Sequence, residues 1–265
     1  MLATFGFLSG GAANTARTQA FLTATGITDA TSISALNAMD TSLISAGLLP
    51  SGTGAGKIKA LYPIVGGTAA THKFNFVDPR DLDAAFRLQF NGGWTHSTNG
   101  ALPNGTNAYA DTFLNASSNL SVSSLSFGGY TSSTENRLAD SYHGASPNAY
   151  LMHSFKTYSF TEYWRPNGAA INLTGGTTGM VQANQLDSLS KIYSNNSIGA
   201  SGVFAITSLP NLNMYIGGVN NNGTAAFFDN HIISYYYYAD GLTDTQASNH
   251  YTAIQTFQTT LGRAV

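Results

Sequence analysis

Four consecutive tyrosines, Tyr235 to Tyr238, constrain the fold of this chain more than any other stretch. Successive side chains of a β-strand point to opposite faces, so a strand here places Tyr235 and Tyr237 on one face and Tyr236 and Tyr238 on the other. Tyrosine tolerates such burial because its ring packs while its hydroxyl finds a hydrogen-bond partner. The run therefore predicts a central strand that is packed on both sides.

The periodicity of the sequence changes directly after the tyrosines. Thr243 and Gln246 match the S/T-x-x-E/Q capping box that begins a helix. The apolar residues that follow recur at helical spacing; they are Ala247, Tyr251, Ile254, Phe257 and Leu261. Residues 243–265 are therefore predicted to form a helix, closed near Gly262, that packs on the strands before it.

Residues 57–242 are predicted to form short strands separated by turn signals such as Pro-Asn-Gly and Asn-Asn-Asn-Gly. In the stretch AAFRLQF, residues 84–90, Phe86, Leu88 and Phe90 alternate with polar residues, which predicts a strand. The stretch TEYWRPNGAAINL predicts a hairpin. About eight or more such strands, with no helices alternating between them, predict an all-β antiparallel sandwich of the jelly-roll kind.

The residues before the sandwich differ in character. Residues 1–14 are apolar and then rich in glycine and alanine, and we interpret them as an arm. Residues 15–56 hold two helical patterns, the first ending at Gly26 and the second capped by Thr28 or Asp29, followed by the linker-like PSGTGAG. The predicted organisation is an arm (1–14), a helical attachment segment with its linker (15–56), the sandwich (57–242) and a C-terminal helix of the same domain (243–265).

Composition excludes several classes of function. Charged residues make up 9% of the chain, the net charge is −2, and only 11 residues are Lys or Arg, which argues against nucleic acid as a partner. No apolar run of about 18 residues is present to span a membrane, and the first residues lack the basic start of a secretory signal. The absence of cysteine excludes disulfides and thiolate metal sites.

Several long phrases resemble known families. The strand followed by Asp240-Gly241-Leu242-Thr243-Asp244 and a terminal helix resembles the end of concanavalin A-like, laminin G-like jelly-roll domains. Residues 61–115, the closing QTFQTTLGR and the stretch FLTATGITDATSISALNAMDTSLISAGL are similar to structural proteins of tailed bacteriophages. The resemblance covers most of the chain from about residue 20, and it implies a virion protein with a concanavalin A-like domain.

The aromatic residues at two places are the candidates for glycan binding. Trp94 and His96 occur in GGWTH, and Tyr163, Trp164 and Asn167 lie at and beside the predicted hairpin turn. Sugars stack their apolar faces on aromatic rings, and amides complete the hydrogen bonds of their hydroxyls. The alternative is that both tryptophans belong to the core, since tryptophan is highly buried on average.

A calcium site is the weak metal candidate. Asp78, Asp81 and Asp83 could offer oxygens to calcium, which takes six to eight of them. The alternative is a turn in which Arg80 pairs with an acid. No other metal and no cofactor is predicted, because the six histidines show no paired spacing.

Catalysis is not predicted. Glycoside hydrolysis needs two carboxylates flanking the scissile bond, and the only glutamates, Glu135 and Glu162, lie apart in the sequence. Nucleophile-elbow and phosphate-loop motifs are absent as well.

These observations lead to one functional hypothesis and two alternatives. The chain is predicted to be a structural protein on the surface of a phage virion, as a capsid decoration, head-fibre or tail-fibre subunit. Residues 1–49 would contact other virion proteins, the chain would form a homo-oligomer, and the lectin-like domain would face outward and adhere to cell-surface glycans. The first alternative is a soluble carbohydrate-binding lectin module, and the second is a polysaccharide-cleaving enzyme.

Overall fold

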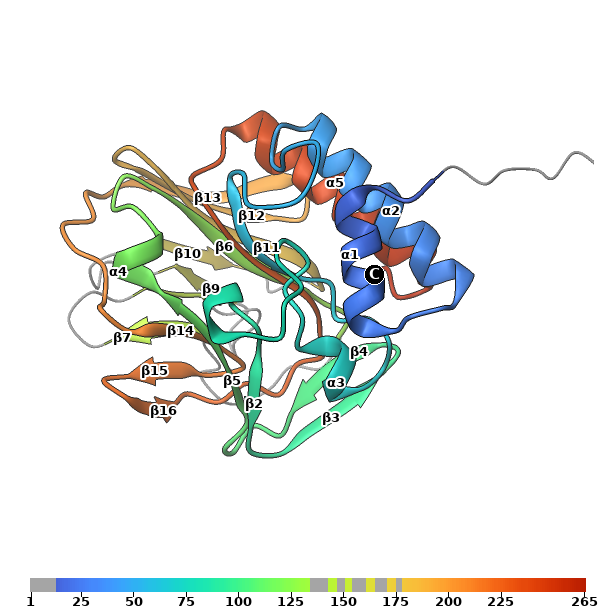
Figure 1. Ribbon diagram of the computed structural model, residues 1–265. Coiled ribbons are helices and arrows are strands. Elements are labelled where there is room, and N and C mark those ends of the chain that lie inside the picture. The colour runs from blue at the N-terminus through green and yellow to red at the C-terminus, as the bar shows by residue number, and fades with distance from the viewer. Residues whose placement is uncertain (1–12, 134–142, 147–150, 154–160, 165–170, 175–177) are drawn as a thin grey trace, which may run out of the picture.

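The computed structural model describes residues 13–133, 143–146, 151–153, 161–164, 171–174 and 178–265. A layer of helices covers one face of a first β-sheet, and a second sheet packs against the other face (Figure 1). The predicted all-β sandwich with helices before it and a helix after it is confirmed. None of the helices in these ranges is long and apolar enough to span a bilayer.

Both sheets are built almost entirely from antiparallel pairs. The first sheet has the strand order β13-β12-β11-β6-β17-β4-β3, with β1 also paired to β17. Its strands are β1 (Ile58–Tyr62), β3 (Trp94–Ser97), β4 (Gly100–Pro103), β6 (Ser124–Thr131), β11 (Gly179–Leu186), β12 (Leu189–Ser194), β13 (Ser197–Val203) and β17 (Ile233–Ala239).

The second sheet has the order β10-β9-β8-β7-β14-β5-β2, and the β15–β16 hairpin joins it through a parallel pairing of β15 with β7. Its strands are β2 (Gln89–Asn91), β5 (Tyr109–Asn115), β7 (His143–Ser146), β8 (Leu151–His153), β9 (Thr161–Trp164), β10 (Ile171–Thr174), β14 (Asn213–Ile216), β15 (Val219–Asn221) and β16 (Thr224–Ala226). The antiparallel pairing of β9 with β10 confirms the predicted hairpin strands.

Three helices form the helical layer, and each begins at a capping residue. In α1 (Ala16–Thr25) the Thr15 side chain accepts from the Thr18 N–H, and in α2 (Ala30–Ser45) Asp29 caps the start. The capping box of Thr243 and Gln246 opens α5 (Asp244–Thr260), as predicted. Short helical turns elsewhere are α3 (Ala69–His72), η1 (Asp83–Ala85) and α4 (Ala116–Asn119).

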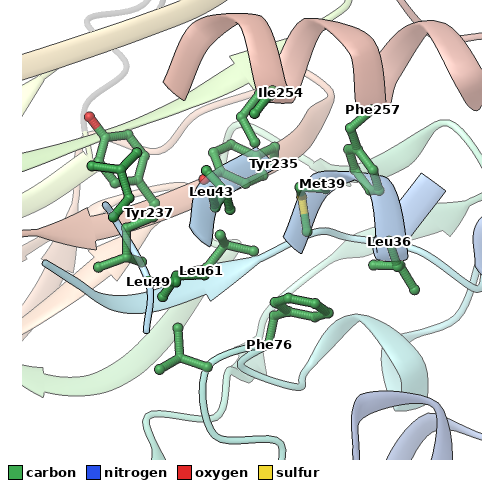
Figure 2. Packing of buried hydrophobic residues seen from close by; sticks show 14 of the residues in the cluster. Leu36, Met39, Leu43, Leu49, Leu61, Phe76, Tyr235, Tyr237, Ile254 and Phe257 are labelled. Carbon is green, nitrogen blue, oxygen red and sulfur yellow. The ribbon is translucent and has the colours of Figure 1, made fainter. Parts of the chain in front are cut away.

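Strand β17 lies inside the first sheet, between β6 on one side and β1 and β4 on the other. Tyr235 and Tyr237 belong to the core shared with the helices, where they meet residues such as Ile254 of α5 (Figure 2). Tyr236 and Tyr238 belong to the core between the two sheets. All four side chains are fully buried, which confirms the predicted central strand.

A buried polar network joins α5 to the first sheet. The Tyr235 hydroxyl lies 2.7 Å from Nε2 of His250, and Nδ1 of His250 lies 3.0 Å from Oε1 of Gln182. An amide oxygen only accepts, so Nδ1 carries the hydrogen and Nε2 accepts from Tyr235. Tyr237 donates to the same Gln182 oxygen and lies 2.7 Å from Oγ of Ser126. The network satisfies polar atoms that would otherwise be costly to bury.

The end of the chain is anchored by a buried arginine. Arg263 is 5% exposed and donates to the carbonyl oxygens of Pro63, Ile64, Thr98 and Ser234. Burial lowers its pKa to about 10, so the guanidinium stays charged at neutral pH. These bonds tie the residues after α5 to loops near β1, β3 and β17.

Residues 15–49 are an integral part of the packed molecule. Leu36, Met39 and Leu43 of α2 lie in the same core as Tyr235 and Phe257 (Figure 2). Asp40 forms a fully buried ion pair with Arg17, which also donates to the carbonyl oxygens of Pro50 and Gly54. The apolar face of these helices is therefore covered by this chain, and contacts of residues 1–49 with other virion proteins stay a prediction.

The predicted strand over residues 84–90 is wrong over residues 84–88, and only Gln89 and Phe90 lie in a strand. A 3₁₀ turn occupies Asp83–Ala85, Phe86 has a φ of 58°, and β2 begins only at Gln89. The loop is held by side chains from elsewhere, because Tyr62 donates to the Phe86 carbonyl (2.6 Å) and Asn75 to that of Ala85 (3.0 Å). Alternating apolar residues can thus be buried without a β-ladder.

The buried histidine of the network makes stability depend on pH. Burial lowers the pKa of His250 to about 3, whereas a histidine in an unfolded chain titrates near 6.5. Between these values the unfolded chain binds a proton that the folded chain does not, so the free energy of unfolding falls as the pH drops through this window. The loss attributable to His250 is up to about 1.4 kcal/mol per pH unit.

We therefore expect His250→Gln, which keeps a donor and an acceptor but cannot titrate, to remove this part of the pH dependence. Urea unfolding at pH 7 and pH 4.5 should show the wild type losing roughly 2 to 3 kcal/mol more than the variant. Asn249→Gln, at the exposed neighbouring position on α5, should keep the wild-type loss. Equal losses in wild type and His250→Gln would contradict the assignment.

Candidate functional site

The face of the second sheet that points away from the first carries aromatic and amide side chains. In β5 the even-numbered residues from Ala110 to Leu114 are buried, so the odd-numbered ones face outward. The same alternation in β14 buries Met214 and Ile216. We call this surface the outer face; among the described side chains it includes Gln89 and Asn91 of β2, Tyr109, Asp111 and Phe113 of β5, and Asn213 and Tyr215 of β14.

Two tyrosine rings form the centre of the outer face. The rings of Tyr109 and Tyr215 are stacked, with centroids 4.6 Å apart and planes at 24°. Tyr215 is the more deeply buried of the two, at 8% exposed, whereas Tyr109 is half-buried. Burial, with help from Asp111 and Tyr109, raises the pKa of Tyr215 to about 12, so its hydroxyl is a neutral donor and acceptor at any physiological pH.

One carboxylate lies beside the tyrosine pair. Asp111 accepts from Nδ2 of Asn213 (3.1 Å) and from the backbone N–H of Phe113 (2.8 Å). Partial burial raises its pKa, and the charge of Asp83 adds to this, while the hydrogen bonds from Phe113 and Asn213 oppose it.

The backbone of β5 is irregular at this point. Phe113 has a φ of 55°, and the pairing of β14 with β5 shifts between Asn213 and Tyr215. Bulges re-aim side chains and are frequent next to functional sites. The irregularity sets the Asp111 carboxylate where it meets both the Phe113 amide and the Asn213 side chain.

Strand register brings these groups into one row. Gln89 pairs with Asp111, Asp111 with Tyr215, and Tyr215 with Gly144 of β7. Residues directly opposite each other share a face of the sheet. The row therefore presents an amide, a carboxylate and a phenol side by side, and it continues past Tyr215 to a residue without a side chain.

Two of the residues predicted from sequence, Trp94 and His96, lie side by side on β3. Their rings stack at 6.1 Å, and Phe90 packs edge-on against both, at 5.1 Å from Trp94 and 4.6 Å from His96. Trp94 donates through Nε1 to the Asn91 carbonyl (3.0 Å). The cluster is half-buried against the core between the sheets, so Trp94 is largely a packing residue.

Trp94 nevertheless adjoins the outer face. Its Nε1 is 3.4 Å from the Tyr109 carbonyl oxygen, and its ring covers Gly217, where an added Cβ would lie 2.8 Å from the indole. Gly217 also has a φ of 77°, so both the backbone and the ring above it require glycine.

Three of the four ring nitrogens of His72 and His96 have partners within the chain. Nδ1 of His72 lies 2.9 Å from Nδ1 of His96, and Nε2 of His72 accepts from the Gly67 N–H (3.1 Å). Burial, followed by the proximity of His96 and Arg263, lowers the pKa of His72 to about 3, and burial also lowers that of His96. Both rings are therefore neutral near pH 7.

The other predicted glycan residues cannot be placed relative to the outer face. Tyr163 and Trp164 lie on β9 of the second sheet, where they pair with Asn172 and Ile171. The side chains of Tyr163 and Trp164, and the whole of Asn167, lie outside the described residues.

The three aspartates of the calcium candidate are each paired with a cation. Asp78 binds Arg80 (2.6 and 2.8 Å), as the alternative interpretation expected, and Asp83 binds Arg87 (2.8 Å). Asp81 pairs with Lys73 and with Arg87. Within the described ranges no group of three or more His, Asp or Glu side chains is arranged to hold a metal.

The sequence interpretation missed the residues of the outer face, although part of the signal was there. YADTFLN alternates Tyr109, Asp111 and Phe113 with small or apolar residues, and NMYI does the same around Tyr215. A solvent-facing side of a strand with aromatic residues is unusual enough to be noted. The stacking of Tyr109 on Tyr215 depends on the pairing of strands far apart in the sequence.

Comparisons with known proteins give partial likenesses. No protein-family model and no curated protein matches the chain. Among solved structures, the NanB sialidase from Streptococcus pneumoniae is similar at a TM-score of 0.41 and 13% identity, over 60% of this chain and 27% of the sialidase. The chain thus spans about a quarter of that enzyme's length.

Two similar structures are smaller domains. The CBM40 of the Ruminococcus gnavus IT-sialidase, bound to α2,3-sialyllactose, has a TM-score of 0.33 and 16% identity, over 46% of this chain and 77% of that one. Domain 4 of AbnA, a GH43 extracellular arabinanase from Geobacillus stearothermophilus, in complex with arabinotriose, has a TM-score of 0.45 and 15% identity, over 73% and 98%.

The ion pairs of Asp78, Asp81 and Asp83 generate a prediction about calcium. Because each carboxylate already has a cationic partner, we expect millimolar Ca²⁺ to leave the thermal unfolding temperature within about 1 °C of its value in EDTA, since a ligand stabilises only in proportion to its binding. Mg²⁺ at equal ionic strength is the control. A rise of several degrees with Ca²⁺ alone, lost in Asp81→Asn, would restore the calcium candidate.

Proposed function

We propose that this chain is a carbohydrate-binding module that holds a glycan on the outer face, without cleaving it. The observation that supports this most directly is the stacked pair of Tyr109 and Tyr215 beside the Asp111–Asn213 pair. A pyranose offers apolar C–H faces and hydroxyl edges. Aromatic rings with an amide and a carboxylate alongside them match both, and a few placed polar groups on an apolar platform are typical of ligand sites.

The charge of the outer face fits a neutral or weakly charged sugar. Asp111 is its carboxylate, and it is hydrogen-bonded to Asn213. The nearby Arg87 is engaged by Asp83 and lies over the Phe113 ring, with its guanidinium carbon 5.8 Å from the ring centroid. The groups left to meet a ligand are mainly phenols and amides, which exchange hydrogen bonds with hydroxyls without burying an unpaired charge.

The described residues of the outer face motivate the proposal of binding without hydrolysis. A glycosidase needs two carboxylates at about 5–5.5 or 6.5–9.5 Å across the scissile bond. On the outer face Asp111 supplies one, while the neighbouring Asp83 is ion-paired with Arg87. The module is therefore proposed to bind sugar and to leave it intact.

The resemblance to phage structural proteins leads us to propose that such a module lies on the surface of a virion. A protein repeated on a virion surface would convert weak single-site binding into firm adhesion through avidity. The position on a particle, the contacts of residues 1–49 with other virion proteins and the homo-oligomer stay predictions from that resemblance.

Loss of the Tyr109 ring tests the proposed site. The chain, biotinylated and made tetravalent on streptavidin, is screened on a glycan array that includes α2,3-sialyllactose and arabinotriose, and the bound sugars are titrated by calorimetry. We expect Tyr109→Ala to weaken binding about tenfold or more, equivalent to about 1.4 kcal/mol, with an unchanged circular dichroism spectrum.

Tyr251→Ala is the matched control, because Tyr251 is a half-buried tyrosine on α5, against the helical core. Its affinity should equal that of the wild type. Absence of binding to any arrayed glycan by the tetravalent chain would refute the proposal, and release of sugar fragments during incubation would replace binding with catalysis.

A further inference from the structure

A groove of about 900 Å³ runs along α1, on the helical side of the molecule and separate from the outer face. One wall is formed by Ala16, Ala20 and Ala24, which share a side of α1. The opposite wall comes from the segment between β1 and β2 and includes Val77, Pro79 and Phe86. The volume is that of a ligand site, and most of the surface is apolar.

The charged groups and the buried amide at this groove have partners within the chain, and Asp78 and Arg80 pair with each other (2.6 Å). Asn75 donates to the Ala85 carbonyl and accepts from the amides of Leu61 and Val77. Lys59 is paired with Asp240 (2.8 Å), and Gly54 accepts from Arg17. An occupant of the groove therefore needs no charge and few hydrogen bonds, and burial of apolar area would supply its binding free energy.

The start of this chain has the matching chemistry. Residues 1–8, MLATFGFL, carry no charged side chain and include two phenylalanines and two leucines. Large side chains of this kind fill space that a wall of alanines leaves open. The described structure begins at residue 13, and α1 begins at Ala16, so the chain enters at the end of the groove where the alanine wall starts.

The lengths are compatible with the segment folding back. Helix α1 has 10 residues and is about 15 Å long at 1.5 Å per residue. An extended stretch of about five residues covers this distance. Residues 9–14, SGGAAN, stand between the apolar segment and α1, and Gly10 and Gly11 allow the chain direction to reverse.

We infer that the groove along α1 binds residues 1–8 of the same chain. Attachment through residues 9–14 keeps the segment at a millimolar effective concentration, which favours the chain's own groove over that of a second copy. The groove is thus an internal receptor for an apolar peptide, from which the segment could be displaced by an apolar peptide of another protein. This inference does not depend on glycan binding.

Because the chain has no cysteine, disulfide trapping tests the inference in the full-length protein. A single cysteine is introduced in the segment as Phe5→Cys, Phe7→Cys or Leu8→Cys, each combined with Ala20→Cys in the groove. The control partner is Ala38→Cys, an exposed alanine of α2. It follows Asn37, whose side chain accepts from the Thr15 amide (2.7 Å), so it lies near the same end of α1.

A disulfide requires Cα atoms about 4.4–6.8 Å apart. We expect at least one Ala20→Cys pair to oxidise to an intrachain disulfide roughly tenfold faster than its Ala38→Cys counterpart, because docking raises the local concentration. Non-reducing electrophoresis separates monomeric from dimeric products. Equal rates for the two partners would overturn the inference, and so would predominantly dimeric, concentration-dependent products, which would assign the groove to a second copy.

A second measurement covers the case in which a cysteine pair disturbs folding. A fluorescein-labelled peptide of sequence MLATFGFLSGGA is titrated into the full chain and into a chain lacking residues 1–8. Binding should be about tenfold or more tighter to the shortened chain, in which the groove is free, since the tethered segment competes at millimolar effective concentration. Equal binding to both chains, or binding to neither, would contradict the inference.

Discussion

The structure depends on one strand whose neighbouring side chains enter two different cores. In β17, Tyr235 and Tyr237 pack with the helices, while Tyr236 and Tyr238 pack between the sheets. Each ring brings a large apolar area, and burying it offsets the conformational entropy of ordering the chain. Because the strand is continuous, we expect the opening of one core to disturb the backbone on which the other is built. The polar network through His250 and Gln182 then fixes how α5 lies on this strand.

This arrangement leaves two different surfaces for function. Within the described residues the second sheet packs its inner face against the first sheet, and its outer face presents Tyr109, Asp111 and Tyr215 on a backbone held by cross-strand pairing. On the helical side, α1 meets the segment between β1 and β2 only in part, which leaves the apolar groove. Paired strands and the loops that they hold position both surfaces.

Much of the fold could be predicted from local patterns. The tyrosine run, the capping box at Thr243 and the β9–β10 hairpin are encoded within a few residues, and the structure confirms them. Residues 84–90 show the limit, since their alternation reflects burial in a loop that Tyr62 and Asn75 hold by hydrogen bonds. The candidate site was harder to predict because Tyr109 meets Tyr215 only through the pairing of β5 with β14. Trp94 and His96 were predicted from their residue types alone, yet Trp94 Nε1 and His96 Nδ1 form hydrogen bonds within the chain.

Native-state hydrogen exchange followed by mass spectrometry would test the role of β17 most directly. If this strand couples the two cores, the amides of β17, of its neighbour β6 and of the buried turns of α2 and α5 should exchange only through global unfolding, with a common free energy that falls equally with added denaturant. Exchange of α2 and α5 at a free energy several kcal/mol lower, while β6 and β17 stay protected, would show that the helical layer opens by itself and would contradict the coupling.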